Sequence, residues 1–138
     1  MRLPTTRKTI PFLKKAQCLT ADLFLAFKGK KYGQFDDIAE LTSFADNLVP
    51  HVLKTEGILS YSQNLAEKIQ HRVKIPINSF EEVELRAFTI QAVEMIKERL
   101  YQRELKVLSI QIDWYLWNLG QSPQYKSLPR HLTHTLYY

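Results

Sequence analysis

The stretch NSFEEVELRAFTIQAVEMIKERL, residues 78–100, constrains the fold of this chain more than any other. Ser79 followed by Glu82 forms the capping-box pattern that marks the start of a helix. The apolar positions after it recur at helical spacing and cover most of the circumference: Val83, Leu85, Ala87, Phe88, Ile90, Ala92, Val93, Met95 and Ile96. A narrow polar strip remains at Glu84, Gln91 and Glu98. A helix that is apolar on nearly all sides is buried by its neighbours, so we expect this one to be central.

A second long helix is predicted at residues 11–29, PFLKKAQCLTADLFLAFKG. Pro11 suits the first helical position, and Gly29 suits the position after the last turn. An apolar stripe at helical spacing should face the core: Phe12, Ala16, Leu19, Leu23 and Phe27. Lys14 and Lys15 lie off that stripe.

Short helices are predicted around residues 35–72. FDDIAELTSFA should form one that stops near Asp46, because Pro50 disfavours helix in the residues just before it. VPHVLKTEG should form the next and end at Gly57. SYSQNLAEKIQHR should begin at a cap, either Ser60 or Ser62.

The last part of the chain is predicted to be one helix and an extended tail. VLSIQIDWYLWNLG, residues 107–120, has a β-branched start that also suits a strand, but its Gly120 stop and its helical neighbours favour a helix. The tail, residues 121–138, holds two prolines and no long period, so it should lie extended on the body. Together these patterns predict an all-α fold with one core, a single helical domain over residues 1–138.

The composition is that of an ordinary globular chain, with 45% hydrophobic and 24% charged residues. No apolar run approaches the roughly 20 residues that span a bilayer, and the start lacks the apolar segment of a secretory signal. The single cysteine, Cys18, cannot form an internal disulfide. We therefore expect a cytoplasmic protein that does not associate with membranes.

Positive charge is concentrated at one end of the chain. The formal net charge is +5, and residues 1–31 hold eight basic side chains against one acid, Asp22. Such a cluster attracts an anionic partner, a phosphate or a nucleic acid, through a screened long-range field. The alternative is a solvated basic face.

Two aspartates stand in apolar surroundings, Asp46 in LTSFADNLVP and Asp113 in SIQIDWYLW. Burial disfavours the charged form of a carboxylate, so each must be paired, protonated or functional. One outcome is an acid that caps a helix or accepts backbone N–H groups. The other is a catalytic carboxylate, which could stabilise a positively charged sugar-like transition state or orient a water, with Lys14 holding it ionised.

Other motifs restrict the chemistry further. The sequence has no nucleophile elbow, no C-x-x-C, no dinucleotide fingerprint and no P-loop. His131 and His134 stand three apart without nearby ligands to complete a metal set, so no metal is expected. Trp114 and Trp117 indicate core packing or a wall on which a flat base could stack. Arg86 should pair with Glu84 or with a carbonyl of the tail.

Several ordered blocks together resemble one family. LKKAQCLTADLFLAFKG, FDDIAELTSFADNLVPHVL, EVELRAFTIQAVEMI, IDWYLWN and HLTHTLYY are similar to the successive blocks of the queuosine salvage proteins, the queuosine 5'-phosphate N-glycosylase family. The resemblance runs from about residue 13 to residue 138 and covers the C-terminal half of the family's chains. It implies a fold related to helix-hairpin-helix DNA glycosylases and hydrolysis of the N-glycosidic bond of queuosine 5'-monophosphate, releasing queuine for tRNA modification. It implies no cofactor, and a small nucleotide as partner rather than direct binding to nucleic acid.

The resemblance also assigns roles to residues. The family's FAD followed by VP falls on Phe44, Ala45 and Asp46, which makes Asp46 the catalytic carboxylate and Lys14 the cation that keeps it charged. The remaining residues implied at the substrate, near the base or the sugar, are Phe44, Asn47, Asp113, Trp117 and Asn118. If Asp113 is instead the catalytic acid, the two aspartates exchange roles and the reaction class stands.

Departures from the family pattern keep alternatives open. Leu132 and His134 stand where the family's tail tends to have arginines, Asn47 replaces an aromatic residue, and Asn118 replaces an acid. The chain could accordingly be a non-catalytic binder of the nucleotide or base, or a basic helical module that binds nucleic acid. Apolar surface left uncovered by the missing half predicts self-association.

Overall fold

A computed structural model of the chain describes residues 12–135. Its helices are α1 (Lys14–Ala26), α2 (Val49–Thr55), α3 (Gln63–Gln70), α4 (Phe80–Tyr101), α5 (Ser109–Gly120) and α6 (Pro123–Lys126), with the 3₁₀ turns η1 (Lys31–Gly33) and η2 (Ile38–Glu40). Within this described part the only β-type pairing is an isolated bridge between Lys74 and Leu132. The all-α prediction is confirmed. The prediction of one domain over residues 1–138 extends beyond the described residues and stays a prediction, as does the relation to helix-hairpin-helix glycosylases.

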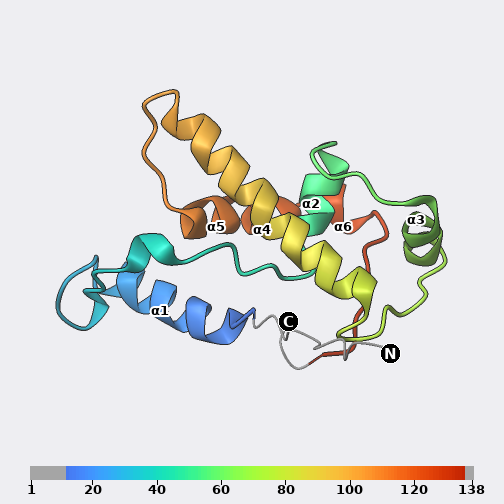
Figure 1. Cartoon of the computed structure of the whole chain (residues 1–138), viewed down its shortest axis with the longest axis horizontal. Coiled ribbons are helices and arrows are strands. Elements are labelled where there is room, and N and C mark those ends of the chain that lie inside the picture. The colour runs from blue at the N-terminus through green and yellow to red at the C-terminus, as the bar shows by residue number, and fades with distance from the viewer. Residues whose placement is uncertain (1–11, 136–138) are drawn as a thin grey trace, which may run out of the picture.

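Helix α4 begins where the sequence predicts and crosses the whole molecule (Figure 1). Ser79 Oγ accepts the N–H of Glu82 at 3.2 Å, and a Glu82 carboxylate oxygen reaches back to the N–H of Asn78, also at 3.2 Å. The helix is less enclosed than expected, however. Phe88 and Met95 are each 55% exposed, because neighbouring helices pack on one side of α4 only.

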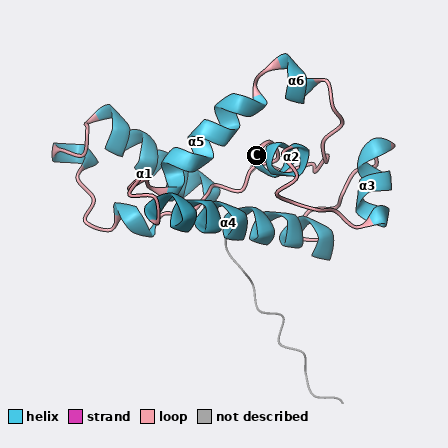
Figure 2. Cartoon of the chain, turned by 90° about the horizontal axis from the view of Figure 1, so that it is seen from above, coloured by secondary structure: helices cyan, strands magenta, loops and turns pink. Residues whose placement is uncertain are grey.

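The main core lies where α2, α4 and α5 meet. Its buried side chains are Val49, Val52, Leu53, Ala92, Val93, Ile112, Leu116 and Tyr125. Gly120 lets α5 approach α2 closely, since a Cβ at this glycine would lie 2.7 Å from Leu48 Cγ and 2.8 Å from a Val52 methyl carbon. Two smaller clusters attach α3 to the start of α4 and α1 to α5. From above, α1 and α3 lie at opposite ends of the molecule (Figure 2).

Helix α1 turns a different face to the core than the predicted one. Leu19 is 62% exposed and Phe27 is 40% exposed, whereas Ala21 is fully buried beside half-buried Cys18 and Phe24. Both faces of this helix carry apolar residues, so the period alone does not choose between them. The face with the small side chains of Cys18 and Ala21 allows the closest approach. Pro11, expected at the first position, lies outside the described residues.

The helix predicted at residues 35–45 is wrong. Only the turn η2 forms, and residues 41–48, which we call the joint, run without helix to the start of α2. Side-chain acceptors replace the helical backbone bonds there: Gln17 Oε1 accepts the N–H of Thr42 at 2.9 Å, and Asp113 accepts the N–H of Phe44 at 3.0 Å. The joint is therefore shaped by residues far away in the sequence.

The remaining elements follow the predictions closely. Helix α2 ends just before Gly57, Ser62 caps α3, and α5 ends at Gly120. The tail forms the short helix α6, which was not expected, and then runs extended beside the segment after α3, where Ile75 N donates to Leu132 O at 2.8 Å. None of the described helices is long and apolar enough to cross a membrane.

Candidate active site

Asp113 fixes the joint to helix α5. Its side chain is 2% exposed, and its Oδ2 accepts both the Ser43 hydroxyl at 2.5 Å and the Phe44 N–H at 3.0 Å. Burial raises the pKa of Asp113 to about 6; the two hydrogen bonds and Lys14 work against this rise, and the charge of Asp46 adds to it. Asp113 is thus a buried acid that holds Ser43 and Phe44 in place.

Asp46 lies at the end of the joint and caps helix α2. The residue is 7% exposed, and its Oδ1 accepts the N–H groups of Leu48 at 2.8 Å and Val49 at 2.9 Å. Both bonds go to one oxygen, and no described residue donates a hydrogen bond to Oδ2. The prediction that this carboxylate is poorly hydrated is confirmed. Its capping role and a role in chemistry are compatible, because they use different oxygens.

The backbone before Asp46 is held in a costly conformation. Ala45 is fully buried with φ of +48°, a left-handed conformation that costs a residue with a side chain roughly 1–2 kcal/mol. Its carbonyl accepts a hydrogen bond from Arg86 Nε at 3.2 Å. Such conformations persist where the surroundings enforce them, and they are common at functional sites.

Arg86 does not pair with Glu84 as predicted, and its predicted bond to a carbonyl of the tail stays a prediction. Arg86 pairs with Glu82 at 3.6 Å and stacks over the Phe12 ring at 4.0 Å, in addition to its bond with Ala45. Glu84 cannot be the partner, because residues two apart on a helix point in different directions, whereas Glu82 is one turn away. The guanidinium therefore connects α4 to the joint, which sequence reasoning did not foresee.

Phe44 is part of the core rather than of an open pocket. The side chain is 6% exposed and meets Trp114 edge to face, with ring centroids 6.4 Å apart. It packs in the core between α1 and α5 and thereby supports the joint.

Asn47 and Trp117 line the same cleft, which has a volume of about 490 Å³. Trp117 is 41% exposed and stands one helical turn after Asp113 on α5. The structure thus brings two of the predicted substrate residues together, beside the joint that carries Asp46. Asn118 lies on the exposed surface of α5, does not line this cleft, and donates its amide N–H to the Trp114 carbonyl at 2.8 Å.

Lys14 lies half-buried on the face of α1 that turns to the joint. Its charge lowers the pKa of Asp113 against the larger effect of burial, and it likewise opposes the rise that burial causes in the pKa of the Cys18 thiol. Lys14 thus acts electrostatically on Asp113 and on Cys18.

His131, from the tail, lies close enough to Asp46 for the charge of that acid to act on it. The residue is 2% exposed, and burial lowers its pKa to about 4 although the charge of Asp46 acts in the opposite direction. The sequence pattern indicates His131 only as a possible metal ligand and does not predict a neutral imidazole near Asp46. His131 and Asp46 are 85 positions apart, and a single sequence contains no pattern that reveals contacts between such distant residues.

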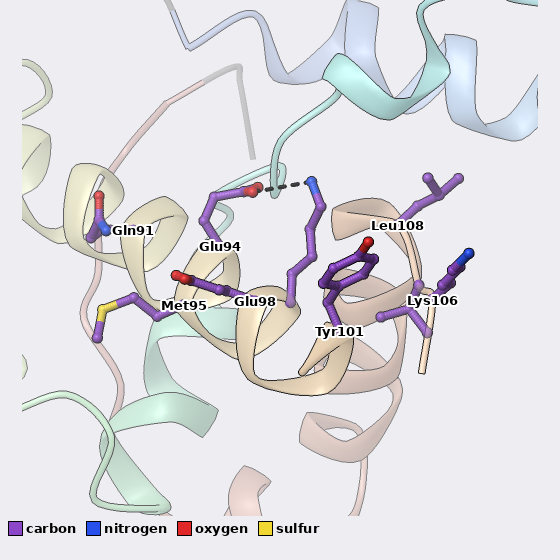
Figure 3. A pocket seen from close by; sticks show the side chains of 9 residues that line it. Gln91, Glu94, Met95, Glu98, Tyr101, Lys106 and Leu108 are labelled. Carbon is purple, nitrogen blue, oxygen red and sulfur yellow. Dashed lines mark hydrogen bonds and ion pairs between the residues drawn. The ribbon is translucent and has the colours of Figure 1, made fainter. Parts of the chain in front are cut away.

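A second cavity, of about 510 Å³, lies away from these residues, between α4 and the segment before α5 (Figure 3). Glu94, Lys97 and Tyr101 line it, and Glu94 and Lys97 are ion-paired at 3.2 Å. None of the predicted site residues lines this cavity.

Comparison with known proteins identifies the family of the chain. The family model for the queuosine salvage protein matches residues 3–138. The chain belongs to this family. A protein of Sphaerobacter thermophilus named queuosine 5'-phosphate N-glycosylase/hydrolase is 45% identical over 129 residues, which cover 94% of this chain and 40% of that protein.

Relatives with the same name occur in distant organisms. The Dictyostelium discoideum protein is 39% identical, with 95% of this chain and 41% of that protein covered. The Mus musculus protein is 34% identical with the same coverage. The chain thus spans about 40% of the length of the relatives it matches.

Proposed function

We propose that this chain forms the part of a queuosine 5'-monophosphate hydrolase that carries the catalytic carboxylate. The observation that carries the proposal is Asp46, a buried acid with one oxygen fixed by two backbone N–H groups and the other not engaged by any described donor. It stands directly before Asn47, which lines a cleft large enough for a small ligand. The names of the relatives supply the substrate class.

In this proposal the bond between the ribose C1' and the base nitrogen breaks, and its electron pair leaves with the base. Positive charge develops on the sugar, and Asp46 Oδ2 stabilises it by charge at close range. A water then adds its hydroxyl to C1', and its proton ends on the departing base. The fixed Oδ1 means that the carboxylate need not reorient during the reaction.

Asp113 is the alternative catalytic acid, and the geometry favours Asp46. Each acid has one oxygen that accepts two hydrogen bonds, so these bonds do not separate them. Asp113 is 2% exposed, whereas Asp46 is 7% exposed and directly precedes the cleft residue Asn47. We assign Asp113 to holding the joint near the base end of the site. Lys14 would balance the negative charge of the two aspartates.

The cleft residues would bind the nucleotide. The ring of Trp117 offers an exposed face for stacking the base, and the Asn47 amide can donate to or accept from the sugar. Phe44 would support the joint from within the core. Asn118, which does not line the cleft, would contact the substrate only at the edge of the site.

Mass spectrometry tests the proposal directly. The chain is incubated with queuosine 5'-monophosphate, and queuine release is compared with that of Asp46→Asn. The asparagine oxygen can still accept the N–H groups of Leu48 and Val49, so the fold should survive while release falls by 100-fold or more, on the order of other lost electrostatic groups. Asp36→Asn, on an exposed acid, is the matched control and should leave release unchanged. Turnover that survives Asp46→Asn would remove Asp46 from the mechanism.

A non-catalytic binder is the second candidate, because the chain spans only about 40% of its relatives. In that case calorimetry would show binding of the nucleotide without product. A nucleic-acid module is a third candidate; its basic residues lie partly outside the described part of the chain. Binding to tRNA that does not weaken steeply with added salt would count against it.

We also propose that the chain self-associates through its exposed apolar surface. Phe88 and Met95 are each 55% exposed and line a groove of about 480 Å³ together with Ile58. Large apolar surfaces of this kind are covered in stable proteins. Sedimentation should show a dimer that Phe88→Gln weakens and Glu98→Gln, on the same helix, does not. A monomer at high concentration would contradict this proposal.

A further inference from the structure

The cleft that Asn47 and Trp117 share also gathers positive charge. Arg72, Lys126 and Arg130 line it, and no acidic residue is among its lining residues. None of these three cations is ion-paired with an acid in the described part of the chain. Like charges brought together without a counter-charge repel one another, so the arrangement favours a bound anion.

The three cations come from separate segments that specific contacts hold together. Arg72 follows helix α3, Lys126 ends helix α6, and Arg130 belongs to the tail, which runs back from α6 past α2 (Figure 2). The bridge between Lys74 and Leu132 fixes the tail beside the segment after α3.

Helix α6 is fixed independently, by buried Tyr125. Its hydroxyl donates to Glu56 at 2.5 Å, and its carbonyl oxygen lies 2.9 Å from His51 Nε2. These contacts hold in place the backbone segments that carry the three cations.

Arg72 follows the end of α3 in a left-handed backbone conformation. Arg72 has φ of +55° at the first position past the cap of α3, where its N–H donates to Ile69 O at 3.0 Å. Glycine is the residue that adopts this conformation without cost. An arginine here accepts backbone strain, and its side chain projects into the cleft.

We propose that Arg72, Lys126 and Arg130 bind the phosphate monoester of the nucleotide. This inference rests on the proposed function and names the end of the substrate that the cleft holds. A phosphate monoester carries close to two negative charges at neutral pH and three acceptor oxygens, which arginine forks bind in pairs. Because Asn47 directly follows Asp46, the sugar of a nucleotide held here can extend toward the catalytic carboxylate.

Lys28 provides a matched control for a test at Arg72. It stands at the same position past the cap of α1, with φ of +54° and its N–H donating to Leu25 O at 3.0 Å, but it does not line the cleft. Both Arg72→Gly and Lys28→Gly remove one exposed cation and relieve the same backbone strain. Both variants should melt at the same temperature as the parent chain or higher.

The first readout is a titration with inorganic phosphate, in which the NMR signal of the Trp117 indole N–H reports how much phosphate is bound. Arg72→Gly should weaken phosphate affinity by roughly 10-fold, the value of one lost charge-assisted pair, and Lys28→Gly should leave it unchanged. Equal affinities for the two variants would overturn the proposal. This readout needs no turnover, so it remains decisive even if the chain does not hydrolyse the nucleotide.

The second readout compares queuosine 5'-monophosphate with queuosine, which lacks the phosphate, by calorimetry. Arg72→Gly and Arg130→Gln should weaken binding of the phosphorylated ligand only. Equal losses of affinity for both ligands would show that the cations contact a part of the substrate other than the phosphate, and would overturn the proposal. Variants that weaken binding of tRNA while leaving the affinity for inorganic phosphate unchanged would also overturn it, in favour of a nucleic-acid surface.

Discussion

Ser43 and Asp113 are separated by 70 positions in the sequence, and the Ser43 hydroxyl donates a 2.5 Å hydrogen bond to Asp113 Oδ2. The adjacent Phe44 N–H donates to the same oxygen at 3.0 Å. These bonds tie the joint to helix α5, and the joint in turn carries Asp46 into the start of helix α2. The stability of the fold and the position of the candidate catalytic acid therefore depend on the same contact.

Ser43→Ala should destabilise the protein by about 1–3 kcal/mol, because it leaves a buried carboxylate with one donor fewer. It also removes the acceptor of the Ala45 N–H, which bonds to Ser43 Oγ at 3.3 Å. Urea unfolding measures the change. Ser127→Ala is the control, since Ser127 is exposed and bonds only within its own turn, to Gln124 O. Similar losses of unfolding free energy in the two variants would show that the bond to Asp113 stabilises the protein no more than an exposed bond does.

The buried acid Asp113 should make the protein less stable as the pH rises from about 4 to 6. Burial raises the pKa of Asp113 from 3.8 to about 6, so in this window the folded state binds more protons than the unfolded state. The stabilising contribution is complete below pH 4 and is lost above pH 6, and its size is up to about 3 kcal/mol. In Asp113→Asn this loss should be absent. Unfolding curves of the parent chain and of the variant, each measured at pH 4 and at pH 7, give the difference in unfolding free energy between the two proteins at each pH. A difference that is the same at both pH values would contradict the assignment.

His131 should act in the opposite direction over a similar range. Burial lowers the pKa of His131 from 6.5 to about 4, so the unfolded state binds more protons between these values and stability rises with pH. The contribution is present above pH 6.5 and is lost as the pH falls toward 4. His131→Gln should flatten this part of the profile, whereas the same change at exposed His134 should not. A change in unfolding free energy that is the same at every pH would indicate that His131→Gln alters packing alone.

The sequence predicts well those elements whose signals are local. Ser79 and Ser62 cap α4 and α3 through bonds to residues three positions ahead, and such spacing is visible in the sequence. The burial of Asp46 was also predictable, because its neighbours are apolar on both sides.

The joint could not be predicted, because its conformation depends on partners that are distant in sequence. Gln17 and Asp113 supply the acceptors that make residues 41–48 extended rather than helical. For the same reason the sequence did not reveal Arg86 at the Ala45 carbonyl or His131 near Asp46. The exposed face of α1 was mistaken for the buried one, because both faces are apolar and only tertiary packing selects between them.

Gly120→Ala should destabilise the protein by about 1–3 kcal/mol through overpacking, since its new methyl group would meet two side chains of the core. A Cβ there would lie 2.7 Å from Leu48 Cγ and 2.8 Å from a Val52 methyl carbon, distances that require α2 and α5 to move apart. Gly57→Ala is an informative comparison, because nothing lies within 4 Å of a Cβ there and only its φ of +74° opposes the change. Because α2 begins just after Asp46, the shift in Gly120→Ala should also lower queuine release. Gly57→Ala, at the other end of α2, should lose stability while keeping its activity, and equal losses of activity in both variants would contradict the link between this contact and the site.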